Sequence, residues 1–386
     1  MSHKLSSRTG FLPVLFFLLT PGFSQDGLPD IFYRHYTGIL DTTMNLTFDL
    51  FSFNGKIEGY YYYGFQIPGS EGGYQYGKTI PITGVKDGSN FSIQEAFNPS
   101  SRFVGTFHQD DQLTGKWERK VYQKEIPFTL KVNHANENIP LKAYHIIKEK
   151  PAITLTRPNE NVPKAIIEIL ILYPEKASNP RFKEVIDQQI TRFMFNVPQA
   201  VTSVELLMEN IVFDFFQSYH HHAEGVENIR ELSSFNWKKT LSMEVIYNSN
   251  YLLTLRFMKH AYSGGGQGIS IQENHVFDIQ KGKKLELSDI LKDGFESQLN
   301  FLLDKKFRSL NGLKRDESLR LAGFLIDQIE YTGNFFVTND GIGFYYNVYE
   351  VAPYSTGTTE LFIPFYELQP LLKQDHPFTW TSFGGN

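Results

Sequence analysis

The first third of the chain is a series of short segments in which apolar and polar side chains alternate, and this series restricts the fold more than any other feature. The clearest segments cover residues 45–53, 56–63, 78–83, 91–96, 102–108, 112–119 and 126–131. Turn-forming pairs such as Asn54-Gly55 and Asp87-Gly88 separate them, as tight hairpins require. Short alternating strands at a spacing of about 8–12 residues are typical of all-β sandwiches and barrels. The sequence therefore predicts a β-barrel-like domain over residues 25–131.

A short pattern recurs inside these strands. An apolar residue, one spacer and a glycine occur together at Gly59, Gly105 and Gly115, and a bulkier residue follows each glycine. Glycine within a strand often marks a bulge, a barrel bend or a close approach of two backbones. The pattern therefore favours a curled or closed sheet.

After residue 164 the pattern changes to a mixture of strands and amphipathic helices. Helical spacing of apolar residues predicts helices over 181–196, 200–219, 295–310 and 316–330. Strands are predicted over 165–172, 242–248, 252–262, 270–278, 334–338, 342–348 and 360–364. The predicted fold class is multidomain: an N-terminal all-β barrel-like domain followed by an α+β domain with helices on a mainly antiparallel sheet.

The predicted domain boundaries follow from these changes of pattern. Residues 132–163 are polar and interrupted by prolines, which is typical of a linker with one extended segment. The expected organisation is a signal peptide (1–24), the β-barrel-like domain (25–131), the linker (132–163), an α+β binding module (164–373, with sub-units 164–235 and 236–373) and a tail (374–386).

The N-terminus has the layout of a secretory signal peptide. Lys4 and Arg8 precede an apolar run over residues 11–20, and small residues follow at Gly22 and Ser24. The run is shorter than the ~20 residues that a membrane-spanning helix needs. We therefore expect cleavage near Ser24, a periplasmic or secreted protein and no integral membrane segment afterwards. A retained N-terminal anchor is the alternative.

Composition excludes several classes of function. The chain has no cysteine, which rules out disulfide frameworks, thiolate zinc sites and a cysteine nucleophile. Its formal net charge is −5, from 37 Lys and Arg against 42 Asp and Glu. A mildly acidic chain lacks the basic surface that nucleic acid requires, so no nucleic-acid partner is expected.

Two motifs look like ligand sites but lack the structural context that the chemistry needs. Residues 72–79 match the phosphate-loop pattern G-x4-G-K-T, yet a strand rather than a helix is predicted after Lys78. His220 and His222, in a run of three histidines, are candidate metal ligands. Adjacent histidines on a helix point about 100° apart, so the run cannot converge on one ion. We expect no cofactor and no metal.

The sequence contains no G-x-S-x-G nucleophile elbow and no H-E-x-x-H metal motif, so we expect no enzyme activity. A pair of catalytic carboxylates of the glycosidase type stays an open alternative. The distance that matters for such a pair is the distance in space, which the sequence does not give.

Two segments are candidates for contacts with a ligand or partner. The first is a glycine-rich loop that joins two predicted strands, where glycines permit a close backbone approach. The second is a tyrosine-rich bend near the C-terminus, a composition that suits carbohydrate or protein contact. The predicted contact residues are Tyr262, Gly264, Gly265, Gly266, Gln267, Gly268, Tyr349 and Tyr354.

These same segments carry a resemblance to a known family. The glycine-rich loop, the turn Phe277-Asp278 with Lys281-Gly282-Lys283 and the stretch 349–357 resemble a bacterial extracytoplasmic domain of unknown function. Residues 167–195 resemble the domain that usually precedes it, so the resemblance covers about 164–373. The pair occurs in the ectodomain of the lysozyme-sensing anti-sigma-V factor and in the N-terminal region of some peptidoglycan deacetylases. Thr47-Phe48-Asp49 resembles the first motif of that enzyme, but Leu50 stands where its second aspartate belongs.

The resemblance implies a binding module. The expected function is a non-catalytic binding protein of the bacterial cell envelope, with a lysozyme-like protein or a peptidoglycan-derived glycan as partner. The alternatives are a glycan-active hydrolase with an unassigned Asp/Glu pair and a purely structural envelope protein.

Overall fold

The computed structural model describes residues 29–66, 74–119, 124–153, 162–175, 179–196, 203–229 and 233–378. The expected signal peptide, Gly72 and Gly73 of the phosphate-loop pattern, and the end of the tail lie outside the described residues. None of the helices in the described ranges is long and apolar enough to cross a membrane.

The N-terminal strands form a closed antiparallel barrel. They are β1 (Phe32–Leu40), β2 (Met44–Phe53), β3 (Lys56–Gln66), β4 (Tyr74–Tyr76), β5 (Ile80–Asp87), β6 (Asn90–Glu95), β7 (Asn98–Phe107), β8 (Gln112–Arg119) and β9 (Lys124–Val132). Neighbours pair in chain order, β4 only extends the rim beside β3, and β9 pairs back with β1. This closure confirms the predicted barrel, and it leaves no free edge around the eight-stranded ring.

Aromatic side chains fill the barrel interior. Phe48 of β2 and Phe103 of β7 are fully buried, and their rings meet edge to face with centroids 4.9 Å apart. Gly105 pairs directly with Gly115, where a Cβ on Gly115 would lie 2.2 Å from the carbonyl oxygen of Val104. The glycines of the sequence pattern therefore allow neighbouring strands to approach closely, as predicted.

A second sheet lies against the outside of the barrel. Its strands are β10 (Leu141–Pro151), β11 (Lys164–Pro174), β12 (Lys238–Ser249), β13 (Leu252–Tyr262), β14 (Ile269–Asp278) and β15 (Lys283–Lys284), in that order. Only the pair β11–β12 is parallel. The crossover between these two strands carries α1 (Pro180–Ile190), a π-helical turn (Thr191–Phe195) and α2 (Val204–Ala223). Parallel neighbours need such a crossover.

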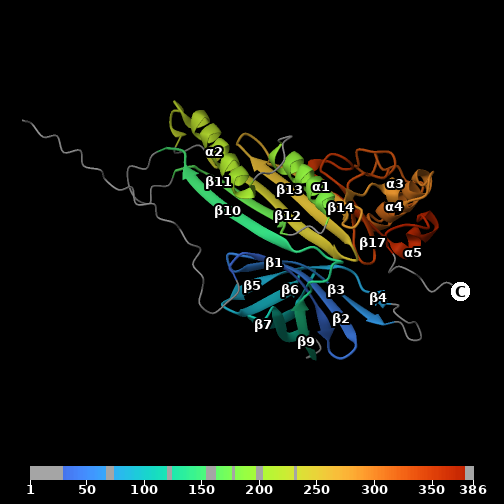
Figure 1. Cartoon of the computed structure of the whole chain (residues 1–386). Coiled ribbons are helices and arrows are strands. Elements are labelled where there is room, and N and C mark those ends of the chain that lie inside the picture. Colours follow the sequence, from blue (N-terminus) through green and yellow to red (C-terminus); the bar gives the residue numbers. More distant parts are fainter. Residues whose placement is uncertain are drawn as a thin grey trace, which may run out of the picture.

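The second sheet is covered on both faces. Helices α1 and α2 lie on one face and the barrel lies on the other (Figure 1). The C-terminal part adds α3 (Leu287–Ile290), α4 (Glu296–Leu310), β16 (Phe335–Val337), β17 (Gly341–Tyr346), β18 (Thr359–Pro364) and α5 (Phe365–Leu368). Single 3₁₀ turns occur at Ser233–Phe235, Tyr354–Thr356 and Gln369–Leu371. The predicted α+β half, with helices on a mainly antiparallel sheet, is confirmed.

The structure differs from the sequence prediction between residues 316 and 330, where the predicted helix is absent and the chain forms turns. Other parts of the chain form hydrogen bonds with its backbone groups instead. Arg308 Nη1 donates to the carbonyl oxygens of Lys314 and Glu317, and the N–H of Leu325 donates to Val351 O. Hydrogen bonds to residues outside the segment therefore override the local helical pattern here.

The segment 132–163, expected to be a linker with one extended segment, contains β10. This strand pairs with β11 from Leu141↔Pro174 to Pro151↔Lys164. The extended segment is therefore an edge strand of the second sheet.

Candidate functional site

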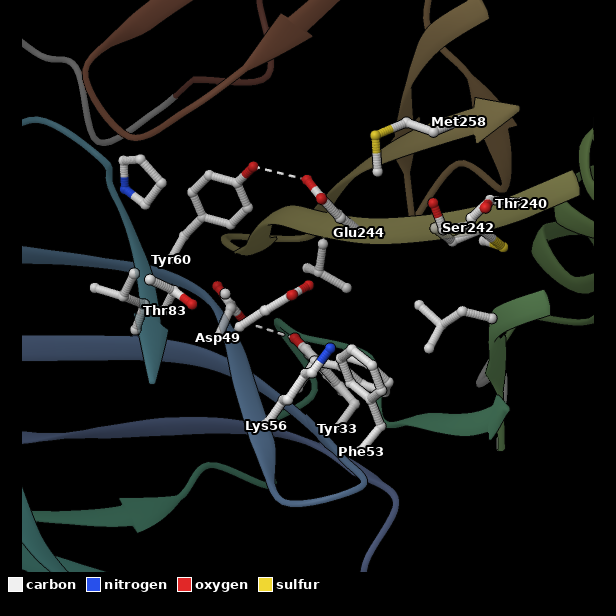
Figure 2. Close-up of a pocket in the computed structure, with 18 of the residues that line it drawn as sticks. Tyr33, Asp49, Phe53, Lys56, Tyr60, Thr83, Thr240, Ser242, Glu244 and Met258 are labelled. Carbon is white, nitrogen blue, oxygen red and sulfur yellow. Dashed lines mark hydrogen bonds between the residues drawn. The ribbon is translucent and has the colours of Figure 1, made fainter. Parts of the chain in front are cut away.

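A cavity of about 430 Å³ lies between the barrel and the second sheet. Its walls come from the outer surface of β2, β3 and β5 on one side and from β11, β12 and β13 on the other. Figure 2 shows Lys56 and Tyr60 of the barrel facing Thr240, Ser242 and Glu244 of β12. The site is therefore built from both halves of the chain.

Alternation along β3 explains why one strand serves both the barrel core and the cavity. Ile57 and Tyr61 point inward and are buried in the barrel core. The residues that alternate with them, Lys56, Glu58 and Tyr60, line the cavity outside. Since side chains of a strand alternate between two faces, this segment is polar on one side and apolar on the other.

The cavity is acidic. Four carboxylates (Asp49, Glu58, Glu168 and Glu244) line it, against one lysine, Lys56. Burial raises the pKa of Glu58, and the negative charge of Glu244 raises it further. The cavity therefore suits ligand groups that donate hydrogen bonds or carry positive charge.

Tyr60 and Arg256 fix the carboxylate of Glu244. Tyr60 Oη donates to Glu244 Oε2 at 2.8 Å, and Arg256 Nη1 donates to the same oxygen at 3.3 Å. Arg256 Nη1 also donates to Tyr60 Oη at 2.9 Å. These bonds join the barrel to the second sheet at one end of the cavity.

A β-bulge in β12 allows a second tyrosine of β3 to contact the second sheet. Tyr60 and Tyr62 share a face of β3, and Tyr62 Oη donates to Ser249 Oγ at 3.0 Å. Glu244 and Ser249 are an odd number of residues apart, so a regular strand would send them to opposite faces. The register of β12 shifts between Val245 and Tyr247, which brings both side chains toward β3.

Ser249, His35 and Asp49 form a Ser-His-Asp arrangement that sequence reasoning missed. His35 Nδ1 lies 2.8 Å from Asp49 Oδ1, and Ser249 Oγ lies 3.5 Å from His35 Nε2. Tyr33 Oη donates to Asp49 Oδ1 at 2.5 Å. A hydrolase needs the serine open to substrate. Here the aspartate faces the cavity while Ser249 is only 8% exposed, so the cluster fits a role in fastening the two halves.

The structure brings the two predicted contact segments together, at a place apart from the cavity. Tyr354 Oη donates to Gly268 O at 2.9 Å, and the rings of Tyr349 and Tyr354 lie 5.9 Å apart. Tyr349 is 63% exposed and has φ 69°, a conformation that non-glycine residues rarely adopt. Exposed Ile269 follows Gly268. None of the eight predicted residues is among those that line the cavity within the described chain.

Gly264 is the position in this loop where glycine is required. Its φ is 91°, and a Cβ there would lie 2.6 Å from the carbonyl oxygen of Ser234. Gly265 also has a positive φ, of 83°, but a Cβ there would meet no other atom within 4 Å. Tyr262 ends β13 and is partly buried, whereas Gly266 and Gln267 are exposed.

The metal and phosphate motifs do not form the sites that their letters suggest. His222 Nδ1 lies 2.8 Å from Ser218 O, and His220 Nε2 lies 3.3 Å from Pro151 O. In the part of the chain that the structure describes, no three His, Cys, Asp or Glu side chains are grouped to hold a metal ion. After Lys78 and Thr79 the chain enters β5, so no helix N-terminus stands behind the loop.

The sequence alone could not identify the residues that line the cavity, since each half of the chain supplies only one of its walls. A signal was present in the run of four tyrosines from Tyr60 to Tyr63 beside Glu58. Tyrosines on the outward face of a barrel strand need partners for their hydroxyl groups, which indicates a covered outer surface.

Comparison with known proteins agrees with the C-terminal part of the resemblance. Residues 288–366 match the family described as "Protein of unknown function (DUF3298)". A DUF3298 family member from Bacteroides fragilis is 22% identical, with a TM-score of 0.54, over 62% of this chain and 96% of that one. A DUF3298 family protein from Pseudomonas aeruginosa is 17% identical, with a TM-score of 0.43, over 61% of this chain and 96% of that one.

In a search of curated proteins, nothing matches this chain. The first structural likeness extends over more of the chain than the family match, and at this identity it shows a shared fold alone. The matched residues include α4 and the three-stranded sheet β16–β17–β18. Residues 288–366, here termed the DUF3298 domain, therefore match a family described as being of unknown function.

Proposed function

We propose that this chain is a non-catalytic binding protein of the bacterial cell envelope, and that its ligand is a glycan bound in the cavity between the barrel and the second sheet. The extracytoplasmic location rests on the N-terminal layout described above. The binding role rests on the cavity, and a peptidoglycan-derived glycan is the expected natural ligand.

The chemistry of the cavity carries the proposal. A sugar ring presents hydroxyl groups around its edge and C–H groups on its faces. The four carboxylates accept hydrogen bonds from hydroxyl groups, and Thr83, Thr240 and Ser242 add hydroxyls that donate or accept. Aromatic rings of Phe53 and Tyr60 line the same cavity and suit the C–H faces. Small-molecule sites commonly combine such rings with a few placed polar groups.

The test is calorimetric titration of the purified protein with a chitin tetrasaccharide, a neutral chain of N-acetylglucosamine. We expect measurable binding that Glu58→Gln weakens at least tenfold, because the amide replaces an acceptor oxygen with a donor. Glu209→Gln is the matched control, since Glu209 is an exposed carboxylate on α2, across the sheet from the barrel. Equal loss in both variants, or no binding by the parent, would contradict the proposal.

The same experiment separates binding from hydrolysis. The raised pKa of Glu58, caused by burial and by Glu244, is a property of carboxyl groups that act as general acids. Release of new reducing ends during the titration would therefore favour the alternative of a glycan-active hydrolase. An intact tetrasaccharide supports the binding protein.

A protein partner such as lysozyme is the second candidate. The observation that favours it is the surface where the loop 262–268 meets Tyr349 and Tyr354. Tyr349 and the adjoining Ile269 are both exposed there. Titration with an animal-type lysozyme tests it. Tyr349→Ala is expected to weaken that complex and to leave glycan binding in the cavity unchanged.

A further inference from the structure

A second cavity, of about 450 Å³, adjoins the first and has the opposite charge balance. Tyr60 and Pro81 line both cavities, so the two share a wall. The second cavity lies between the loop before β5 and the DUF3298 domain, which supplies Lys306, Asp340 and Glu360. The two cavities together therefore follow the junction between the barrel and the rest of the chain.

The loop that carries Lys78 is held against the DUF3298 domain. Thr79 Oγ1 donates to Asn339 Oδ1 at 2.5 Å, and Asn339 Nδ2 donates to Gly77 O at 2.5 Å. The charge of Lys78 also acts on the partly buried carboxyl of Asp340. These contacts on both sides of Lys78 restrict where its ammonium group can lie.

The cations of the second cavity outnumber its carboxylates. Lys78, Arg256 and Lys306 line it, against Asp340 and Glu360. Arg256 is already matched, because Nη1 contacts Glu244 and Nη2 lies 3.5 Å from Glu360 Oε2. Neither lysine forms an ion pair with another residue of the described chain. Two ammonium groups therefore remain for a ligand.

Burial also perturbs the two carboxylates of this cavity. Burial raises the pKa of Asp340, and burial likewise raises the pKa of Glu360. Three phenylalanines, Phe97, Phe336 and Phe362, complete the lining, and Phe97 is 87% exposed. The cavity thus combines apolar surface with unmatched positive charge, whereas its neighbour combines hydroxyls with negative charge.

We infer that the second cavity is an anion subsite, and that the ligand of the two adjoining cavities is an acidic glycan whose negatively charged group lies between Lys78 and Lys306. This inference rests on the proposed glycan binding. It adds that the ligand carries negative charge, and it states which end of the ligand lies in each cavity. Hydroxyl-bearing sugar lies at the acidic end, and the anion lies at the lysine end. The anion is a carboxylate, borne either by a sugar ring or by a short peptide attached to the sugar.

Three probes test the inference by calorimetry at low ionic strength. They are the chitin tetrasaccharide, a hyaluronan tetrasaccharide with ring carboxylates, and muramyl dipeptide with peptide carboxylates. We expect at least one acidic probe to bind about tenfold or more tightly than chitin, a difference that falls as salt screens the charges. The acidic probe that binds more tightly identifies the source of the carboxylate.

The lysines are tested by the double substitution Lys78→Ala with Lys306→Ala. It should lower the affinity of the acidic probe to that of chitin and leave chitin binding within about twofold. Lys131→Ala with Lys305→Ala is the matched control, since Lys131 is an exposed residue of β9 and Lys305 is the exposed neighbour of Lys306 on α4. Far-UV circular dichroism confirms that each variant is folded.

The outcomes separate the inference from the proposal on which it rests. Equal affinity for all three probes, or an unchanged preference in the lysine double variant, would overturn the anion subsite and leave glycan binding standing. Failure of every probe to bind would contradict the proposed function and the subsite together. A preference for an acidic probe that disappears only in the lysine double variant supports both.

Discussion

Strands β2 and β3 present opposite chemistry on the two sides of the barrel wall. Inside, the rings of Phe48 and Tyr61 both meet Phe103 edge to face, within a core of aromatic and aliphatic side chains. Outside, Asp49 accepts a hydrogen bond from Tyr33 of the neighbouring barrel strand, and Tyr60 donates one to Glu244 of the second sheet. One alternating sequence serves both sides because consecutive side chains of a strand point in opposite directions.

The contrast between the two sides of the barrel wall shows where a cavity for a ligand can lie. Eight-stranded barrels either hold a small ligand or are filled by their own side chains. The packed phenylalanines place this barrel in the second group, and the cavity of about 430 Å³ lies on its outer surface. The barrel therefore acts as a wall of the site.

The largest expected effect on stability comes from a substitution inside the barrel. Phe103→Ala removes a fully buried ring that contacts Phe48, Tyr61 and Phe128. We expect a loss of about 3–5 kcal/mol in the free energy of unfolding, measured by urea denaturation. Affinity for the chitin tetrasaccharide should persist while the variant is folded. A loss below about 1 kcal/mol would mean that the interior is not tightly packed.

Asp49→Ala is expected to have the next largest effect, on the outer side. It leaves Tyr33 Oη and His35 without their buried acceptor. The expected loss is about 2–3 kcal/mol by the same measurement, because buried polar groups without partners are destabilising. Asp110→Ala, in an exposed turn, is the control and should change stability little. Equal stability of the two variants would show that the cluster does not fasten the two halves.

A double-mutant cycle tests the smaller contact between Tyr62 and Ser249. Tyr62→Phe and Ser249→Ala each remove one end of the hydrogen bond of 3.0 Å. We expect a coupling energy of about 1 kcal/mol in the free energy of unfolding. Additive losses in the double variant would show that the bond contributes nothing to holding the barrel against the sheet.

The smallest effect is a pH dependence at Glu58. Because its folded-state pKa lies above the ordinary value of 4.5, ionisation of Glu58 destabilises the folded protein as pH rises through that raised pKa. Glu58→Gln should therefore have a higher Tm than the parent at pH 7. The difference should shrink as pH falls below about 4.5, where the carboxyl is protonated in both states. The same Tm difference at every pH would contradict the assignment.

Local patterns were sufficient for most of the fold. Alternation around turn pairs predicted the barrel strands, and helical spacing predicted α4 within about one residue. The predicted helix over 316–330 was wrong because the Arg308 side chain and the more distant Val351 carbonyl oxygen form hydrogen bonds with its backbone groups. No window of sequence contains that information.

The site was harder to predict than the fold for the same physical reason. The contact between Tyr60 and Glu244 joins residues 184 positions apart, and a bulge in β12 decides which side chains meet the barrel. By contrast, Gly268 and Tyr354 were chosen for their composition, and the structure places them in contact. Whether that surface binds a partner stays a prediction.

The boundary of the DUF3298 domain has an evolutionary consequence. Residues 288–366 contribute six side chains to the second cavity and none of those that line the first. Gene fusion that replaced the barrel would therefore exchange Asp49, Glu58 and Lys78. It would keep Glu168 and Glu244 of the second sheet, and Lys306 of the matched residues. Each cavity would then combine one new wall with one inherited wall, so a single fusion event would alter the sugar contacts and the anion contacts together.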